Sequence, residues 1–264
     1  MLAVASGQPK QKNALRWYDH IAINTYWFGI NVASGTITPV LLPYLVALFA
    51  PPESKNTYLA SIRVIGLAVA MMVQPVSGML SDRSTHPIGR RRPFIVGGTL
   101  FNVLFLLVVG SSVLFMDSPL DEKLLNLPGV TLAYLVLLAG IALLQVSSNV
   151  AQGALQGLIP DIVPDNQRGR ASGVKAVMEL LPAFLVIGMG PLVDAGRTWW
   201  VIAIIIGVFL VTMLITVLCV NEEPLKKKPA GGLREPVLRI LALATIFVAV
   251  TRGSVAVVRM AGSQ

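Results

Sequence analysis

The sequence has very few of the residues from which metal sites and disulfides are built. It contains one cysteine, Cys219, and two histidines, His20 and His86, which lie far apart in the chain. A single cysteine excludes an intrachain disulfide, and so few ligands do not make a metal site. The sequence also lacks a nucleotide-binding loop and a nucleophile with a paired base, so we expect neither an enzyme nor a bound cofactor.

Charged residues are scarce as well. They make up 13% of the chain, whereas a soluble domain carries about a quarter. Hydrophobic residues make up 55%, and several apolar runs exceed the roughly 20 residues that a helix needs to cross a bilayer. The composition therefore excludes an ordinary soluble domain and predicts an all-α bundle of helices that spans a lipid bilayer.

Six membrane spans are predicted, at residues 21–48, 58–80, 94–116, 130–159, 171–195 and 199–220. Together they form a predicted six-helix bundle at 21–220, which follows a cytoplasmic N-terminal segment at 1–20. After it we expect a cytoplasmic linker at 221–235, and then an incomplete seventh helix and tail at 236–264. Arg252 and Arg259 interrupt the last apolar run.

The net charge of +8 does not indicate a nucleic-acid partner, because the basic residues gather in short loops and not on one continuous face. With the N-terminus inside, fifteen lysines and arginines fall in the inner segments and three in the outer loops. The positive-inside rule then predicts a multi-pass protein of the plasma (inner) membrane with a cytoplasmic N-terminus.

The loop after the second span combines an acid with a block of arginines. Asp82 lies at the C-terminal end of its helix, where the helix dipole disfavours a negative charge. It therefore needs cationic partners, and Arg83 and the cluster Arg90-Arg91-Arg92 are within reach. We expect at least one of these arginines within about 3 Å of Asp82. A plain positive-inside loop would explain the arginines, but not Gly78 or Asp82.

A similar motif occurs 112 residues later in the chain. The segment from Gly78 to Asp82 is similar to the segment from Gly190 to Asp194, and the same offset aligns Arg63 with Lys175. One copy ends an inward helix and the other an outward helix, which predicts an inverted repeat of three plus three helices. Two further pairs are expected: an outer pair of Asp194 with Arg197, and a weaker inner pair of Asp161 with Arg168 or Arg170.

The fourth span carries a stripe of amides. Gln145, Asn149, Gln152 and Gln156 lie within an arc of about 60° on an ideal helix. Amides that faced lipid would be costly, so the stripe should face a cavity, together with Asn24 and Asn31 of the first span. The alternative is that these amides only join neighbouring helices.

Glu179 is the predicted ion-coupling residue. It lies about two turns inside the fifth span, where an ionised carboxylate needs a partner. Lys175 is one turn away on the same helix, and Arg63 is a possible partner across the bundle. The alternative is a fixed pair of Lys175 and Glu179 with a structural role only.

Residues 20–220 resemble the N-terminal six-helix half of a transporter of the major facilitator superfamily, whose signature loop is similar to the one that contains Asp82. Within that superfamily, Gln74-Pro75-x-x-Gly78 and Asn149-x-x-Gln152-Gly153 resemble the plant sucrose carriers and the bacterial glycoside–pentoside–hexuronide cation symporters. The sequence departs from this pattern at Gln156, where sucrose carriers tend to have an arginine, which puts sucrose itself in doubt.

The resemblance implies a secondary transporter for a small polar solute, a sugar or glycoside, that works by alternating access coupled to a proton or sodium ion. Such transporters have twelve helices, so we expect a truncated product or an assembly with a C-terminal half or a second copy. The alternative is a non-transporting membrane assembly or pigment-associated protein. The expected gating residues are Gly78, Asp82, Arg83, Gly89, Arg90, Arg91, Arg92, Asp161, Arg168, Arg170, Asp194 and Arg197.

Overall fold

The computed structural model describes residues 14–116, residues 131–220 and six single positions between 222 and 242. The described residues form helices and connecting turns, with no strand among them. Six helical segments are long and apolar enough to cross a membrane, as the sequence predicts. The predictions for residues 1–13, for the loop at 117–130 and for most of the linker and seventh helix lie outside the described residues.

Three spans are continuous helices: α3 (Lys55–Asp82), α4 (Arg92–Ser111), which ends in the short turn η2 (Ser112–Phe115), and α11 (Thr198–Cys219). The first span consists of α1 (Trp17–Thr36), η1 (Ile37–Leu41) and α2 (Leu42–Phe49). The fourth consists of α6 (Leu132–Gln156) and α7 (Leu158–Ile162). The fifth consists of η3 (Asp165–Gln167), α8 (Arg168–Leu180), α9 (Pro182–Ile187) and α10 (Met189–Asp194).

Proline accounts for two of the breaks in these spans. Pro39 lies inside η1, a π-helical turn, and Pro43 opens α2. Pro182 is the first residue of α9. Proline lacks an N–H and clashes with the preceding turn, so the regular hydrogen-bond ladder is interrupted at each of these points.

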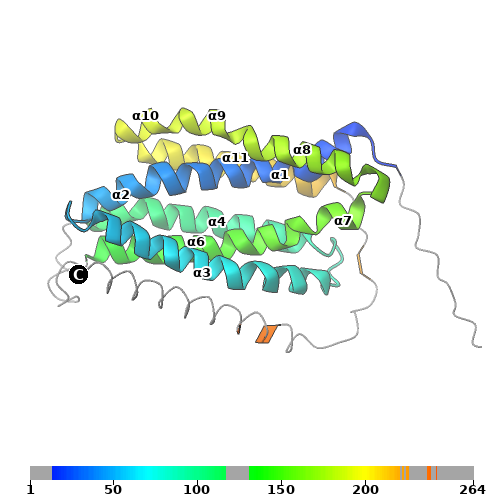
Figure 1. The fold of residues 1–264 in the computed structure, drawn as a ribbon, viewed down its shortest axis with the longest axis horizontal. Coiled ribbons are helices and arrows are strands. Elements are labelled where there is room, and N and C mark those ends of the chain that lie inside the picture. Colours follow the sequence, from blue (N-terminus) through cyan, green and yellow to red (C-terminus); the bar gives the residue numbers. More distant parts are fainter. Residues whose placement is uncertain are drawn as a thin grey trace, which may run out of the picture.

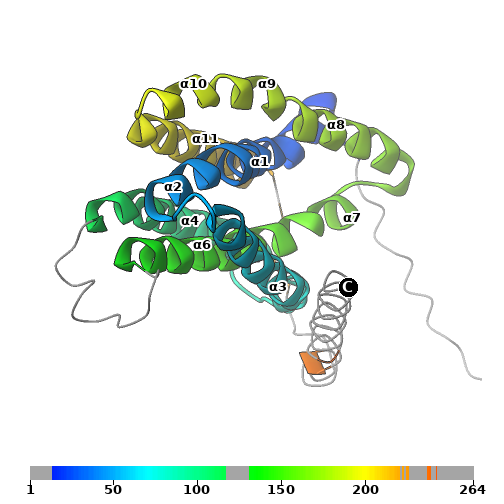
Figure 2. The same ribbon diagram turned by 60° about the vertical axis from the view of Figure 1, so that its left-hand side comes forward.

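The helices form two layers (Figures 1 and 2). One layer contains α1, α11 and the segments α8 to α10, and the other contains α3, α4 and α6. The first span packs on the fifth and sixth, the fourth packs on the second and third, and α4 meets α11 between the layers. When spans one, two and three are exchanged with spans four, five and six, respectively, the same set of contacts results. This symmetry confirms the predicted inverted repeat.

Two glycines allow α3 and α6 to cross closely. A Cβ at Gly153 would lie 2.5 Å from the carbonyl oxygen of Gln74 and 2.9 Å from the nitrogen of Gly78. Ser77 donates a hydrogen bond of 2.7 Å to the carbonyl of Val150 beside this crossing. Small residues of this kind bring membrane helices together. The crossing fixes both the end of α3 that carries Asp82 and the face of α6 that carries the amides.

Candidate gating network and transmembrane cavity

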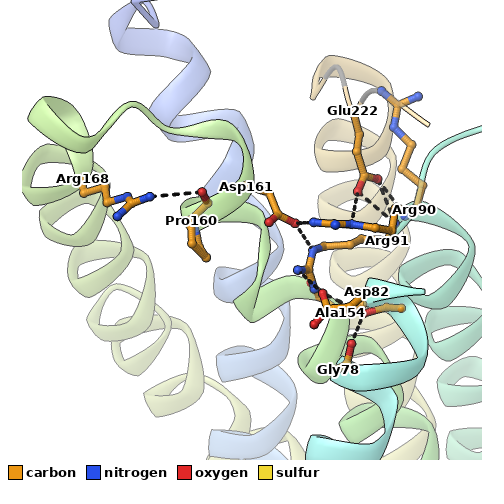
Figure 3. A network of polar contacts seen from close by, with 11 residues as sticks. Gly78, Asp82, Arg90, Arg91, Ala154, Pro160, Asp161, Arg168 and Glu222 are labelled. Carbon is orange, nitrogen blue, oxygen red and sulfur yellow. Dashed lines mark hydrogen bonds and ion pairs between the residues drawn. The ribbon is translucent and has the colours of Figure 1, made fainter. Parts of the chain in front are cut away.

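The end of the bundle where α3 stops and α4 begins, called here the basic end, is held by the guanidinium of Arg91. Its Nη2 donates to Asp82 Oδ1 at 2.5 Å and its Nε donates to Asp161 Oδ2 at 2.5 Å. Its Nη1 donates to Ser81 Oγ at 3.2 Å and to the carbonyl of Ala154 at 3.3 Å. Figure 3 shows this arrangement. The arginine expected near Asp82 is therefore present.

Arg91 is enclosed by protein, whereas Asp82 is not. The side chain of Arg91 is 6% exposed and that of Asp82 is 52% exposed. The guanidinium lies where a Cβ at Gly157 would be, so the break between α6 and α7 also makes room for it. Burying a guanidinium is costly unless carboxylates and carbonyls take up its donors, as they do here.

Asp161 joins α7 to the arginine loop, and the predicted pair of Asp161 with Arg168 or Arg170 is wrong. Asp161 accepts hydrogen bonds from both Arg90 and Arg91. Arg168 instead pairs with Asp165 at 2.9 Å, three residues earlier. Arg170 is exposed, and no ion pair of its own is found among the described residues. The reason is geometric: α7 runs toward the arginine loop, while η3 leads the chain away from it into α8 (Figure 3).

Glu222, which the sequence analysis did not single out, completes the network. Its carboxylate accepts from the backbone nitrogens of Arg91, at 2.9 Å and 3.1 Å, and of Arg92, at 3.4 Å. These are unpaired donors at the N-terminus of α4, where the helix dipole favours a negative charge. The side chain is only 5% exposed. The signal in the sequence was the acidic pair Glu222-Glu223 shortly after the sixth predicted span.

Of the remaining members of the loop, Gly89 and Arg92 lie beside this carboxylate. Gly89 has a φ of 131°, a backbone conformation that residues with a side chain rarely adopt, so the backbone here favours glycine. Arg92 donates to the carbonyl oxygens of Val220 and Ile88. Arg83 is half-buried and directly follows α3.

Arg90 shows how strongly the carboxylates act on this loop. Burial works against its charged form, but the hydrogen bond that it donates to Asp161 and the charges of Asp161, Asp82 and Glu222 raise the pKa of Arg90 above its ordinary value. Its guanidinium is therefore a permanent charge that holds α7 and the linker residue Glu222 to the same loop.

The second copy of the motif makes no such network, and the predicted outer pair is wrong. Asp194 and Arg197 are both exposed, and the described residues include no ion pair between them. Gly190 has nothing within 4 Å of the place where its Cβ would lie, so no close helix crossing fixes the end of α10 as Gly78 fixes α3. The loop also has one arginine where the first copy has four.

A cavity of about 230 Å³ lies between α1, α3 and α6. Its polar lining comes from all three helices, and most of the remaining wall is apolar. Two amides of the predicted stripe, Gln145 and Gln152, line it. Gln145 Nε2 lies 3.5 Å from the carbonyl of Gly66, and Gln74 Nε2 donates to Gln152 Oε1 at 3.3 Å. Half of the stripe therefore faces a cavity and also contacts α3.

The other amides do not line this cavity. Asn149 is buried and donates to the carbonyl of Gln145, and Gln156 is exposed. Asn24 is fully buried and donates to the carbonyls of His20 and Ala171, which ties α1 to α8. Asn31 donates to the carbonyl of Trp27. The expectation that Asn24 and Asn31 share this cavity is wrong, because neither lines it: Asn24 joins α1 to α8, and Asn31 donates to a carbonyl of its own helix.

Glu179 forms the expected local pair and not the cross-bundle one. Its Oε1 lies 3.5 Å from Lys175 Nζ, and the Glu179 side chain is 38% exposed. The same ammonium group lies 4.0 Å from the centre of the Trp27 ring, a cation–π distance. Arg63 lines the cavity instead, and no ion pair between Arg63 and Glu179 exists among the described residues.

Comparison with known proteins gives a consistent picture. Residues 26–260 match the Major Facilitator Superfamily. The chain is 30% identical over 175 residues to a general alpha-glucoside permease of Schizosaccharomyces pombe, covering 62% of this chain and 30% of that protein. It is 31% identical over 140 residues to a sucrose transport protein of Arabidopsis thaliana, covering 51% and 23%. A sucrose transport protein of Oryza sativa is 31% identical over 193 residues, covering 69% and 35%. These alignments cover about a third or less of the length of each relative.

Proposed function

The chain belongs to the major facilitator superfamily, and from this premise we propose that it supplies one half of a secondary transporter for a sugar or glycoside. The observation that carries the proposal is the cavity between α1, α3 and α6, with Gln145 and Gln152 in its wall. Amides suit sugar hydroxyls because each can donate and accept a hydrogen bond. The names of the relatives, a permease of alpha-glucosides and several sucrose carriers, support this class of solute.

The network at the basic end is proposed to act as a gate. It links α3, the start of α4, α7 and Glu222 through charge-assisted hydrogen bonds, which are strong but reversible. Alternating access requires contacts at one end of the bundle to break while those at the other end form. By the positive-inside rule, we assign the basic end to the cytoplasm.

The second half of the transporter is proposed to cover α3 and the fifth span. These two spans are the least buried of the six, and they are equivalent in the inverted repeat. The cavity volume of about 230 Å³ is also slightly below the roughly 300 to 1,000 Å³ of complete small-molecule sites. A second six-helix bundle, from a longer polypeptide or from a second copy, would supply the facing wall. The pair of Lys175 and Glu179 is the proposed site of ion coupling.

The test is solute binding followed by uptake. The purified chain is titrated with sucrose and methyl α-glucoside, and it is then reconstituted in liposomes with and without an inward gradient of protons or sodium ions. We expect saturable binding, and accumulation of labelled solute only with a gradient. A folded chain that binds no glycoside and accumulates none contradicts the proposal and favours a non-transporting role in membrane assembly.

A further inference from the structure

A chain of buried polar side chains leads from the contact between the two layers to the wall of the cavity. The hydroxyl oxygens of Tyr26 on α1 and Thr99 on α4 lie 2.5 Å apart. Asn102, about one turn farther along α4, accepts hydrogen bonds from Ser147 at 2.5 Å and from Ser148 at 2.9 Å, both on α6. Tyr26, Thr99 and Asn102 are fully buried. Of these five side chains, Ser148 alone lines the cavity.

The positions of the hydroxyl protons follow from a group beside this chain that can only accept. Thr99 Oγ1 lies 2.7 Å from the backbone carbonyl of Ile95, and a carbonyl has no proton to give, so Thr99 donates to it. The proton between Tyr26 and Thr99 must then come from Tyr26. The Tyr26 oxygen can therefore only accept from its other polar neighbour, the side chain of Asn102.

This requirement orients the amide of Asn102. Its nitrogen must face the Tyr26 oxygen, because an amide oxygen there would place two acceptors against each other in a buried site. Its Oδ1 therefore faces α6, where the hydroxyls of Ser147 and Ser148 both donate to it. The two lone pairs of Oδ1 are then both used. The proton of Ser148 is thus committed to Asn102.

The cavity wall consequently presents Ser148 by its lone pairs. Gln152, one turn later on α6, presents the opposite polarity. Its Oε1 accepts from Gln74 at 3.3 Å, so its NH₂ group is the part that can serve a solute. Two adjacent positions of the same helix therefore offer an acceptor and a donor to whatever occupies the cavity.

We infer that Ser148 recognises one hydroxyl of the solute strictly as a hydrogen-bond acceptor, and that Asn102 is the positioning residue that gives Ser148 this polarity. This inference rests on the proposed function and adds a rule of selectivity to it. At one position the solute must carry a hydrogen-bond donor. A hydroxyl meets this requirement, whereas a fluorine or a hydrogen in its place leaves the acceptor of the site unpaired.

The experiment compares methyl α-glucoside with its deoxy and deoxyfluoro analogues at each of its hydroxyls. A deoxy analogue loses both the donor and the acceptor of one hydroxyl, whereas a deoxyfluoro analogue keeps a weak acceptor and loses the donor. Binding to the purified chain is measured by isothermal titration. At one position we expect both analogues to bind about fivefold or more weakly than the parent glucoside, the loss expected when a polar group of the site is left unpaired.

Two neighbouring serines provide a matched pair of variants. Ser147 and Ser148 both donate to Asn102, but of the two only Ser148 lines the cavity. Ser148→Ala should bring the parent glucoside and both analogues at the sensitive position within about twofold of one another, because the acceptor is gone. Ser147→Ala should keep the differences seen in the wild type.

Asn102→Leu tests the positioning role. It removes the acceptor that holds the Ser148 proton, so the hydroxyl can turn and donate to a fluorine of the solute. At the sensitive position the deoxyfluoro analogue should then bind about threefold more tightly than the deoxy analogue, whereas in the wild type the two bind alike. A purely structural role of Asn102 would weaken all the probes equally and leave this ratio unchanged. Asn102→Ala replaces the leucine variant if that variant does not fold.

The inference is contradicted if no hydroxyl of the glucoside requires a donor, or if a deoxyfluoro analogue binds like the parent at the position that Ser148→Ala affects. It also fails if Ser147→Ala removes the discrimination as fully as Ser148→Ala does. An unchanged ratio in Asn102→Leu would show that Asn102 does not set the polarity. In all these cases glycoside binding remains and the proposed function stands. If no probe binds to a folded chain, both this inference and the proposed sugar site fail.

Discussion

At the scale of single residues, Arg91 connects more parts of the basic end than any other side chain described. It reaches Asp82 on α3, Asp161 on α7 and the carbonyl of Ala154 on α6, while its own backbone nitrogen donates to Glu222. Three helices, α3, α6 and α7, therefore depend on one guanidinium. Replacing Arg91 should therefore lower the stability of the bundle and also affect any gating.

Replacing this guanidinium gives the first prediction. Arg91→Ala removes a buried cation and leaves two partly exposed carboxylates with fewer partners, so we expect a loss of about 1.5–3 kcal/mol, the size of a hydrogen bond to a charged group. The matched control is Arg168→Ala, because the pair of Arg168 with Asp165 is largely exposed and should contribute less than about 1 kcal/mol. The loss of stability in each variant is measured by thermal unfolding in detergent. Equal losses in the two variants would show that Arg91 is not the centre of the network.

Glu179 gives the second prediction. Glu179→Gln keeps the size of the side chain but removes the charge that pairs with Lys175. In a reconstituted, transport-competent assembly we expect gradient-driven accumulation to be lost while exchange of solute across the membrane continues. Retained accumulation would mean that the pair of Lys175 and Glu179 is only structural.

The sequence predicts contacts within a loop better than contacts between distant segments. The contact between Asp82 and Arg91 spans nine residues and could be predicted, because the loop has few conformations that separate them. The contacts of Asp161 with Arg90 and of Glu222 with Arg91 span 71 and 131 residues. They depend on the positions of α7 and of Glu222 relative to the arginine loop. The packing of the helices determines these positions. The same limit explains the wrong partner expected for Asp161, whose actual partners lie 70 and 71 residues away. The failed pair of Asp194 and Arg197 is local, and both side chains are exposed.

At the scale of helices, the position of α3 depends on its crossing with α6. A side chain at Gly153 would meet the backbone of α3, whereas a side chain at Gly190 on α10 would meet nothing within 4 Å. The two glycines thus play different parts, although both belong to helices of the bundle.

The third prediction uses this contrast. Gly153→Ala forces α3 and α6 apart, and overpacking of this kind costs about 1–3 kcal/mol. Gly190→Ala should be neutral or slightly stabilising, since alanine is the better helix former by up to about 1 kcal/mol. The melting temperatures of the two variants are compared with that of the wild type. A Gly153→Ala variant as stable as the wild type would mean that the crossing is looser than described.

The start of α4 gives the fourth prediction. Glu222→Ala removes the carboxylate that accepts from the backbone nitrogens of Arg91 and Arg92. These amides should then exchange with solvent at least about tenfold faster, a cost of roughly 1.4 kcal/mol in local opening. Hydrogen–deuterium exchange followed by mass spectrometry measures this on peptides that contain the start of α4. Exchange that stays at the wild-type rate would rule out the capping role.

The helices themselves were largely predictable from the sequence, and their irregularities were not. Long apolar runs set the six spans, and Pro39 and Pro43 indicated the break in the first. The subdivision of the fifth span at Pro182 and Gly188 depends on which neighbours restore the lost backbone hydrogen bonds. The amide stripe was placed on one face, but Asn24 and Asn31 turned out to contact backbone carbonyls. Local periodicity predicts which side chains share one face of a helix, but not which neighbouring element that face contacts.

At the scale of the whole molecule, the inverted repeat is preserved in the packing of the helices and broken in their chemistry. Spans that correspond make corresponding contacts. The first repeat carries the arginine network and Arg63 in the cavity wall, and the second carries the pair of Lys175 and Glu179. Among the described residues, Asp194 and Arg197 form no ion pair with each other. This division supports a bundle with a gate at one end, a solute site between α1, α3 and α6, and an ion site on α8.

The fifth prediction tests the solute site most directly, by titration calorimetry of the purified chain with the tightest-binding of sucrose, methyl α-glucoside and methyl α-glucuronide. Removing both cavity amides, in Gln145→Ala with Gln152→Ala, should weaken binding by more than about tenfold, because each amide contributes about 1 kcal/mol or more. Gln156→Ala, which removes an exposed amide of the same stripe, should bind like the wild type. Unchanged affinity in the double variant, or an equal loss in Gln156→Ala, would contradict a sugar site in this cavity.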